Sequence, residues 1–353
     1  MPAIEGISFM VENTAYRPNL VRVLTVIITP TSFVGQEGSL LINMSLNLIS
    51  VNKCFGDKRV IEDLNLCIPK GEVFGFLGPN GAGKTTTMRM ILDIIRPDSG
   101  QVMWEDKIVT LATARSFGYL PEERGLYPKM VVSDQMYFFA RLRGLSKAEA
   151  KKRIGYWSDR FQVGELAKKK ANELSKGNQQ KIQFIIAVLH QPELMILDEP
   201  FSGLDPVNVE LLKTAFRDLA KEGRTILFSS HRMEHIEELC DSLCIIKQGR
   251  LIAQGPVDTI KRITGRKIIR LRMVGSFDFL KYFSLDLGKL ALKHGKYEEG
   301  VLQEAQEVEF DLPEGIDPQA ILQGAVENGQ VKRFEIGDPS LNEVFITLVG
   351  GNS

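Results

Sequence analysis

The 353-residue sequence has no long apolar run, no excess of charge of either sign and few cysteines. No stretch reaches the roughly 20 apolar residues that a membrane-spanning helix needs. The best candidate, residues 20–28, is too short and contains Arg22. No basic segment followed by an apolar core opens the chain, so no signal peptide is predicted. Any role at a membrane is therefore expected to depend on a partner.

The sequence contains 44 Lys plus Arg and 44 Asp plus Glu, so its formal net charge is zero. This balance gives no support for a protein that binds nucleic acid or an anionic membrane through bulk charge. The four cysteines are too few and too scattered for a disulfide framework. Cys240 and Cys244 have no second Cys or His pair nearby to complete a metal site. We expect reduced, buried thiols in a cytosolic protein of about two domains.

The chain is organised around a glycine-rich segment that lies between an apolar run, 73–77, and a helical stretch, 86–95. Strand, glycine-rich loop and helix in this order form the context of a phosphate-binding loop, and they count against an ordinary glycine turn. Glycines let the backbone direct N–H groups at one anion, and the helix N-terminus adds positive charge. Lys84 is predicted to reach the β- and γ-phosphates, and the Thr85 hydroxyl to bind Mg²⁺. The residues expected to hold the phosphates are Gly78, Pro79, Asn80, Gly81, Ala82, Gly83, Lys84, Thr85 and Thr86.

A second apolar run, 194–197, ends in the carboxylates Asp198 and Glu199. In open α/β sheets, ligands bind at the carboxyl ends of strands. Asp198 is therefore predicted to hold Mg²⁺, directly or through water, and Glu199 to act as general base toward the attacking water. Alone, this pattern also fits a solvated strand end. Together with the phosphate loop, it predicts a nucleotide-hydrolysing site.

A segment between these two motifs, 174–178, reads Leu-Ser-Lys-Gly-Asn and resembles the signature sequence of ABC ATPases. The order of phosphate loop, signature and Asp-Glu strand distinguishes that family from other P-loop proteins. Residues 202–205 resemble its D-loop, and His231 resembles its switch histidine. The resemblance spans about 45–265 and implies an α/β fold: a P-loop NTPase core with an antiparallel β subdomain and a helical insert at about 122–190.

The resemblance implies a head-to-tail dimer that buries two molecules of ATP, with Mg²⁺, between its subunits. The signature helix of one subunit would face the γ-phosphate bound by the other, although Ser175 could also be a simple N-cap. His231 would bind the γ-phosphate and hold the water and Glu199 in register. Phe55 stands where the family places an aromatic that stacks on adenine, and a core Phe in a β-hairpin is the alternative. The other residues that the resemblance assigns to nucleotide binding are Ser175, Lys176, Gly177, Asn178 and Asp205.

Two segments depart from the family pattern. Glu122 follows residues 118–121, where the family usually has Gln. Its carboxylate can still ligate Mg²⁺ but adds negative charge beside the phosphates. In the signature, Lys176 replaces a common glycine and Asn178 a common Gln, and Lys176 adds positive charge near a phosphate. We expect both departures to be compatible with hydrolysis.

Residues 266–350 are predicted to form a separate small α+β C-terminal domain. Residues 122–128 and 339–345 resemble segments of exporter ATPases from drug or sodium efflux systems. We therefore expect the ATP-hydrolysing subunit of an ABC exporter in the cytoplasm, held at the inner face of the cell membrane by an integral membrane permease. The second ATP-binding subunit would be an identical copy or a paralogue, and no nucleic acid is expected.

Two other functions compete with transport. A non-transport ABC ATPase that acts on ribosomes or DNA usually has two cassettes or a long coiled-coil insert, and this sequence has one cassette and no sustained heptads. A regulatory module that holds ATP without turnover is disfavoured because Glu199, the expected base, is present.

Further predictions concern the first 43 residues and the starts of two helices. Residues 1–43 show no clear pattern, and Met44 opens the first clean strand pattern. We favour a leader upstream of a physiological start at Met44, and an N-terminal extension that packs on the domain 44–265 is the alternative. Capping boxes at Ser146 and Glu149, and at Ser340 and Glu343, each predict a helix start.

Overall fold

The computed structural model describes residues 45–123, 125–283, 285, 291–292, 305–313 and 315–350. The leader at 1–43 lies outside the described residues. The chain divides into two compact units, the first ending at Val257 and the second beginning at Asp258, and each is described by itself. Within the described ranges, no helix is long and apolar enough to cross a membrane.

A six-stranded sheet forms the centre of the first unit, and its strands β3, β7 and β8 are completely buried. All neighbouring strands pair parallel except β10, which pairs antiparallel with β9 through a turn at Gln248 and Gly249. Both turn residues have positive φ, 51° and 79°, as the tight two-residue hairpin turn requires. In spatial order the strands are β10 (Arg250–Pro256), β9 (Ser242–Lys247), β3 (Val73–Leu77), β8 (Thr225–Ser229), β7 (Leu194–Leu197) and β6 (Gly118–Leu120).

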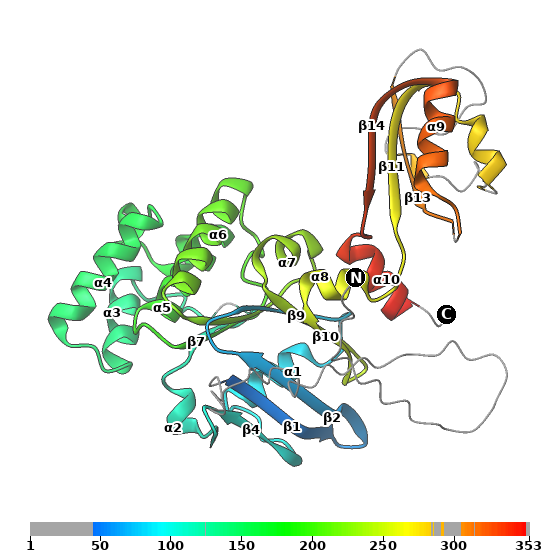
Figure 1. Ribbon diagram of the computed structural model, residues 1–353. Helices are drawn as coiled ribbons and strands as arrows, with labels where there is room; N and C mark the ends of the chain where they lie inside the picture. The colour runs from blue at the N-terminus through cyan, green and yellow to red at the C-terminus, as the bar shows by residue number, and fades with distance from the viewer. Residues whose placement is uncertain are drawn as a thin grey trace, which may run out of the picture. The chain divides into compact units, whose positions relative to one another are not determined.

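One face of this sheet is covered by helix α1 and a four-stranded antiparallel sheet, drawn in blue and cyan in Figure 1. Phe74 and Phe76 of β3 share one core with Leu46 and Leu48 of β1 and with Met88 of α1. Alternate residues of β3 point to this face because side chains alternate along a strand. The elements of this layer are β1 (Ser45–Phe55), β2 (Lys58–Pro69), α1 (Lys84–Ile91), β4 (Ser99–Trp104), β5 (Lys107–Ile108) and α2 (Leu111–Ala114).

Helices cover the opposite face of the six-stranded sheet, on its upper side in Figure 1. Gly75 of β3 faces α7, because a Cβ at this glycine would lie 2.9 Å from Ile236 Cγ2. Phe184, Phe216 and Phe228 join α5, α6 and β8, with ring centroids 5.9 and 5.5 Å apart. These helices are α5 (Lys176–Val188), α6 (Pro206–Lys221) and α7 (Met233–Leu239).

The predicted range of the helical insert, about 122–190, also contains α5, and the part of the insert before α5 packs on that helix through α3 and α4. Its elements are α3 (Val132–Leu142), α4 (Lys147–Arg160) and the short 3₁₀ turns η2 (Gly164–Leu166) and η3 (Ala171–Glu173). Ser146 caps α4 as expected, accepting a 3.2 Å hydrogen bond from the Glu149 N–H. The second half of that capping box is wrong, because the Glu149 carboxylate accepts instead from Arg153, one turn further along (2.7 Å).

The second unit is a small α+β domain with an antiparallel sheet of order β12-β13-β11-β14. Its core joins one face of the sheet to α9, with Leu271, Val308 and Ile321 fully buried. Ser340 and Glu343 form the predicted capping box, since each side chain accepts from the other residue's N–H (3.3 and 2.8 Å). The elements are α8 (Val257–Arg262), β11 (Ile268–Gly275), η4 (Asp278–Phe283), β12 (Ala291–Leu292), β13 (Gln306–Asp311), α9 (Pro318–Asn328), β14 (Gly329–Gly337) and α10 (Leu341–Gly350).

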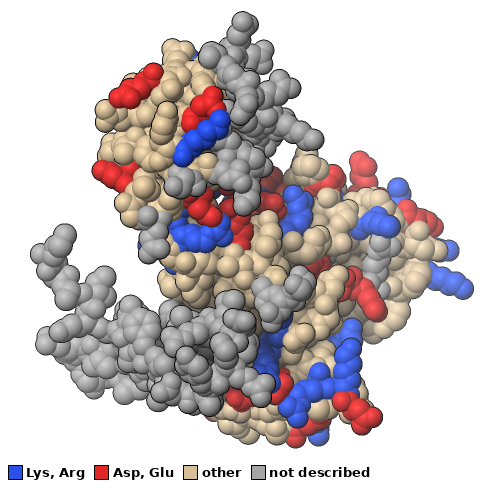
Figure 2. Space-filling view, turned by 90° about the vertical axis from the view of Figure 1, so that its right-hand side faces the viewer, with Lys and Arg blue, Asp and Glu red and all other residues tan. Residues whose placement is uncertain are grey.

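Charged side chains of both signs are interspersed on the face of the molecule shown in Figure 2. In the second unit, charged side chains also pair across strands. Arg270 of β11 donates to Glu309 of β13 (2.7 Å) and to Glu335 of β14 (3.3 Å). Together, the parallel core, the antiparallel subdomain, the helical insert and the α+β C-terminal domain confirm the predicted fold class.

Candidate functional site

The glycine-rich loop, 78–83, lies at the carboxyl end of β3 and leads directly into α1. Lys84 Nζ donates hydrogen bonds to the carbonyl oxygens of Gly78 (2.7 Å) and Pro79 (3.2 Å), so its ammonium group lies inside the loop. A Cβ at Gly78 would lie 2.5 Å from the carbonyl oxygen of Ile246, so only glycine fits there. A tight loop, a helix N-terminus and an enclosed lysine are the features that a nucleotide phosphate chain needs.

The helix after the loop begins earlier than predicted, at Lys84 instead of residue 86, and ends at Ile91 instead of residue 95. Gly83 has φ 106° and acts as the N-cap, so the helix starts immediately after it. A Cβ at Gly83 would lie 2.5 Å from Ile61 Cδ1. Strand β2 therefore packs directly against the end of the loop. At the other end, Asp93 with φ 51° terminates the helix.

Three side chains converge where β7, β8 and α1 meet. Asp198, which is 2% exposed, accepts a hydrogen bond at each carboxylate oxygen. Thr85 Oγ1 donates to Oδ2 (2.8 Å), and Ser229 Oγ donates to Oδ1 (2.5 Å). These two bonds fix the orientation of the carboxylate. Sequence reasoning missed Ser229; its position at the carboxyl end of a strand, like that of Asp198, was the available signal.

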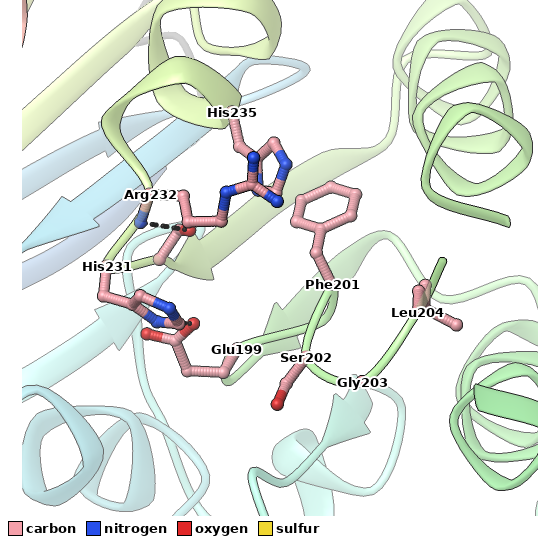
Figure 3. Close-up of a pocket in the computed structure, with 9 residues that line it drawn as sticks. Glu199, Phe201, Ser202, Gly203, Leu204, His231, Arg232 and His235 are labelled. Atoms are coloured by element: carbon pink, nitrogen blue, oxygen red, sulfur yellow. Dashed lines mark hydrogen bonds and ion pairs between the residues drawn. The ribbon is translucent and has the colours of Figure 1, made fainter. Parts of the chain in front are cut away.

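Glu199 follows Asp198 and is turned out of the strand by a positive φ of 50°. Its main-chain N–H donates to Ser229 Oγ (3.0 Å), so the same serine holds both acidic residues. The Glu199 carboxylate lies 2.9 Å from His231 Nδ1, and Figure 3 shows the two side chains pointing toward one another. The structure thus brings the predicted base and the predicted switch histidine together.

Burial and charge shift the pKa values of this site in opposite directions. Burial raises the pKa of Glu199, and the neighbouring His231 and Lys84 oppose that rise. Burial lowers the pKa of Lys84, and Glu199, Asp198 and Glu122 oppose that fall. A carboxyl group with a raised pKa is better matched to proton abstraction near neutral pH. Glu122, whose side chain is exposed, lies close enough to act electrostatically on Lys84.

The donor set fits Mg²⁺ bound together with a nucleotide. Among the described residues, no group of three or more His, Cys, Asp or Glu side chains could hold a metal ion by itself. Mg²⁺ usually takes one or two carboxylates together with phosphate oxygens and waters. Thr85 Oγ1 and Asp198 Oδ2 lie 2.8 Å apart beside the glycine-rich loop and provide a hydroxyl and a carboxylate.

The signature residues begin α5, on the face of the sheet opposite α1. Ser175 Oγ caps this helix, accepting from the Asn178 N–H (3.3 Å). A Cβ at Gly177 would lie 3.1 Å from the carbonyl oxygen of Gly203, so the signature and the D-loop pack closely within one chain. Asp205 caps α6 in the same way, accepting from the N–H three residues further on (3.0 Å). Each loop is therefore rigidly tied to a helix start.

Phe55 ends β1 at the hairpin turn to β2, and it is 49% exposed. The alternative of a core Phe therefore does not describe it. Lys53 Nζ lies over the ring, 5.5 Å from its centroid. The ring is placed where it can stack on a planar group from outside.

A cavity of about 190 Å³ opens beside Glu199 and His231. In Figure 3 the Phe201 ring lies beside His235, with ring centroids 4.4 Å apart. His235 is 3% exposed, and burial lowers its pKa to about 4, so its ring is neutral at pH 7. The cavity is lined by Glu199, Phe201, Ser202, Gly203, Leu204, Ser230, His231, Arg232 and His235.

Strand, glycine-rich loop and helix, set beside a buried Asp-Glu strand end, define a P-loop nucleoside triphosphatase. Residues 61–202 match the family model described as ABC transporter, and residues 255–349 match the C-terminal domain of DrrA1-3-like ATP-binding proteins. The chain is 50% identical over 306 residues to the uncharacterized ABC transporter ATP-binding protein YhaQ of Bacillus subtilis, covering 86% of this chain and 98% of that protein. It therefore belongs to the ABC transporter ATP-binding proteins, with a DrrA-like C-terminal domain.

Three further comparisons agree. The chain is 31% identical over 310 residues to the linearmycin resistance ATP-binding protein LnrL of Bacillus subtilis, covering 85% of this chain and 97% of that protein. The solved ATP-binding subunit of an ABC transporter superposes with a TM-score of 0.59 at 31% identity, over 63% of this chain and 93% of that chain. A dimeric bacterial ABC transporter cassette, at 21% identity and a TM-score of 0.56 over 60% of this chain and 98% of that one, shares the fold.

Proposed function

We propose that this chain is the ATP-hydrolysing subunit of an ABC exporter and drives transport through a separate integral membrane permease. The observation that carries the proposal is the 2.9 Å contact between Glu199 and His231 beside the Thr85–Asp198 pair. One chain would thus supply a base and its orienting partner next to a pair of residues that could bind a metal ion. A module that only held ATP would need neither a base nor a residue that orients the base.

ATP binding is proposed to use the glycine-rich loop and its lysine. The loop N–H groups would surround the phosphates, and Lys84 would exchange its bonds to the Gly78 and Pro79 carbonyls for phosphate oxygens. Thr85 and Asp198 would hold Mg²⁺, and Glu122 is proposed as a further oxygen donor. When bound, the ion neutralises charge that develops on the transferred phosphoryl group. Phe55 is proposed to stack on the adenine.

Hydrolysis is proposed to start with proton transfer from a water molecule to Glu199. The water oxygen bonds to the γ-phosphorus while the bond from that phosphorus to the ADP oxygen breaks, and Glu199 retains the proton. His231 would orient the Glu199 carboxylate, to which it is already bound, and would contact the γ-phosphate. The raised pKa of Glu199, caused by its burial, supports this role because a stronger base accepts the proton more readily.

A second ATP-binding subunit is proposed to complete each site. Ser175, Lys176, Gly177 and Asn178 begin a helix, where free N–H groups favour an anion. This helix lies on the face of the sheet away from α1. Its anion-binding end would therefore serve the γ-phosphate on a partner chain, an identical copy or a paralogue, with Asp205 at the same contact.

The helical insert is proposed to receive the permease. Tyr127, Phe138 and Leu142 are 53%, 44% and 66% exposed, and Tyr127 stacks on Phe139 with ring centroids 6.0 Å apart. Exposed apolar side chains grouped in this way mark a protein contact. The loop that carries Glu122 leads into the same region, so this contact would link the nucleotide site to the membrane partner. The subunit would thereby be held at the inner face of the membrane.

Export is proposed as the direction because relatives carry such names. One is a linearmycin resistance protein, and another is a Nod factor export ATP-binding protein, 35% identical over 62% of this chain. The test is purification of the tagged chain from detergent-solubilised membranes, followed by ATPase assays over a range of concentrations. We expect a polytopic membrane protein in the complex and a specific ATPase rate of the isolated chain that rises with its concentration. Ribosomes or DNA in place of the membrane protein, or a rate independent of concentration, would contradict the proposal.

A further inference from the structure

Lys53 and Phe55 lie two residues apart on β1, so their side chains share one face of the strand. Lys53 Nζ lies over the Phe55 ring, 5.5 Å from its centroid, within the range of a cation–π interaction. The lysine side chain is 15% exposed, whereas the whole phenylalanine residue is 49% exposed. The ammonium therefore covers one side of the ring, and the ring remains open to solvent elsewhere.

Asp98 fixes this lysine from the turn before β4. Its Oδ1 accepts from Lys53 Nζ (2.6 Å), and its Oδ2 accepts from the Cys54 main-chain N–H (2.7 Å). Its own main-chain N–H donates to the Asn52 carbonyl (2.9 Å). The Lys53 ammonium holds the pKa of the Asp98 carboxyl below its usual range. Three consecutive residues of β1 are thus bound to one aspartate, and the lysine head group is held in place.

The same hairpin is anchored on the phosphate loop. Gly83 approaches β2 so closely that a Cβ would lie 2.5 Å from Ile61 Cδ1 and 3.2 Å from the Val60 carbonyl oxygen. The Glu62 N–H donates to the Gly249 carbonyl (3.0 Å), which joins β2 to the β9–β10 turn. The position of the Phe55 ring relative to the phosphate loop is therefore set by packing at the base of the hairpin.

We propose that Lys53, fixed by Asp98, is a positioning residue that holds the Phe55 ring for stacking on the nucleotide base. This inference rests on the proposed role of Phe55. The lysine occupies one side of the ring, so the base would meet the other side, in a cation–ring–base arrangement. Because Asp98 neutralises the lysine at 2.6 Å, the pair adds little net charge. The Lys53–Asp98 pair should therefore affect the affinity for ligands that contain a base, and not the affinity for phosphate chains in general.

The experiment compares ADP, which has a base, with pyrophosphate, which has none, and neither is hydrolysed. Dissociation constants with Mg²⁺ are measured by calorimetry on the full chain and on the double variant Lys53→Met/Asp98→Asn, which removes both charges together. We expect ADP binding to weaken about fivefold, the scale of an exposed cation–π contact, and pyrophosphate binding to stay within error. Asp98→Asn alone should weaken ADP binding less, because the cation remains but is no longer fixed.

Lys107→Met is the matched control, because Lys107 is an exposed lysine of the same antiparallel sheet but lies on the edge strand β5, away from Phe55. This control variant should leave unchanged the ratio of the dissociation constant for ADP to that for pyrophosphate. If the double variant lost affinity equally for both ligands, Lys53 would act only through charge, and the inference would be overturned. The inference would also be overturned if Lys107→Met weakened ADP binding as much as the double variant does. Phe55→Ala separates the two proposals. If it leaves the ratio unchanged, the role of Phe55 itself fails. If Phe55→Ala raises the ratio of the dissociation constant for ADP to that for pyrophosphate while the double variant does not, only the inference about Lys53 fails.

Discussion

Thr85 Oγ1 donates a 2.8 Å hydrogen bond to Asp198 Oδ2 and so joins two residues that are 113 positions apart in the sequence. Thr85 belongs to the first turn of α1, and Asp198 follows the buried strand β7. The bond brings a hydroxyl and a carboxylate, both suited to Mg²⁺, to one point beside the phosphate loop.

Thr85→Ala should therefore abolish the effect of Mg²⁺ on nucleotide affinity. A hydrogen bond to a charged group contributes about 1.5–3 kcal/mol, and on that scale we expect MgATP to bind at least about tenfold more weakly. ATP binding in EDTA should change little, and Thr85→Ser should retain the response to Mg²⁺. Titrations with and without the metal test this, and an equal loss in both conditions would contradict it.

Glu199→Gln should lower the ATPase rate by about 10²–10⁴-fold, the usual contribution of a general base. The affinity for ATP should be retained, because the amide keeps the size of the side chain and the phosphate loop is untouched. Glu193→Gln is the control, since Glu193 precedes β7 at the other end of the strand and its side chain is 57% exposed. Steady-state rates and binding constants of the three proteins provide the comparison. A Glu199→Gln rate above a tenth of that of the unmodified protein would argue for another base.

His231→Ala should move the acid limb of the kcat–pH profile to higher pH. Burial raises the pKa of Glu199, and His231 is the strongest influence that opposes this rise. Removing the histidine leaves the neutral carboxyl more favoured, so a higher pH is needed to ionise the base. His231→Gln can still donate a hydrogen bond to Glu199 and should shift the limb less. An unchanged profile with a lowered rate would show that His231 acts on the phosphate alone.

Gly81→Ala and Gly83→Ala should affect folding stability differently. Both glycines have positive φ, 76° and 106°, which costs an alanine about 1–2 kcal/mol. At Gly81 no atom lies within 4 Å of the added Cβ, whereas at Gly83 it would collide with Ile61 Cδ1 at 2.5 Å. Overpacking adds about 1–3 kcal/mol, so Gly83→Ala should be clearly the less stable variant. Urea unfolding followed by the fluorescence of Trp104 and Trp157 reports on this unit, and equal midpoints would refute the expected close contact.

Acidification below pH 6.5 should destabilise the first unit. Burial lowers the pKa of His235 from 6.5 to about 4, so the unfolded chain binds this proton more readily than the folded chain. The stabilisation is complete above pH 6.5 and is lost as the pH falls toward 4, on the order of 2 kcal/mol by pH 5. His235→Phe retains a ring against Phe201 and should flatten the decline. Burial also lowers the pKa of His190 to about 4, so part of the decline in stability should remain in this variant. Identical pH dependence in the variant would show that His235 does not contribute.

Local patterns predicted the elements that carry the phosphates. Residues 73–77 and 194–197 are apolar because they form strands buried on both faces, and this made them recognisable. Glycines at 78, 81 and 83 indicated a tight loop, and the structure shows why two of them are required there. Helix boundaries were less accurate, because the start of α1 depends on the left-handed Gly83 and not on periodicity.

The sequence by itself determined the fold class and the order of the motifs, because burial and turn formation depend on side chains that are close together along the chain. Only the tertiary structure decided which distant groups meet. Ser229 binds Asp198 and Glu199 because β7 and β8 are parallel neighbours. Asp98 reaches Lys53 because β4 pairs with β1. Strand order and register bring such pairs together, and both depend on which faces of distant segments are buried against one another, so a local pattern does not show which strands become neighbours.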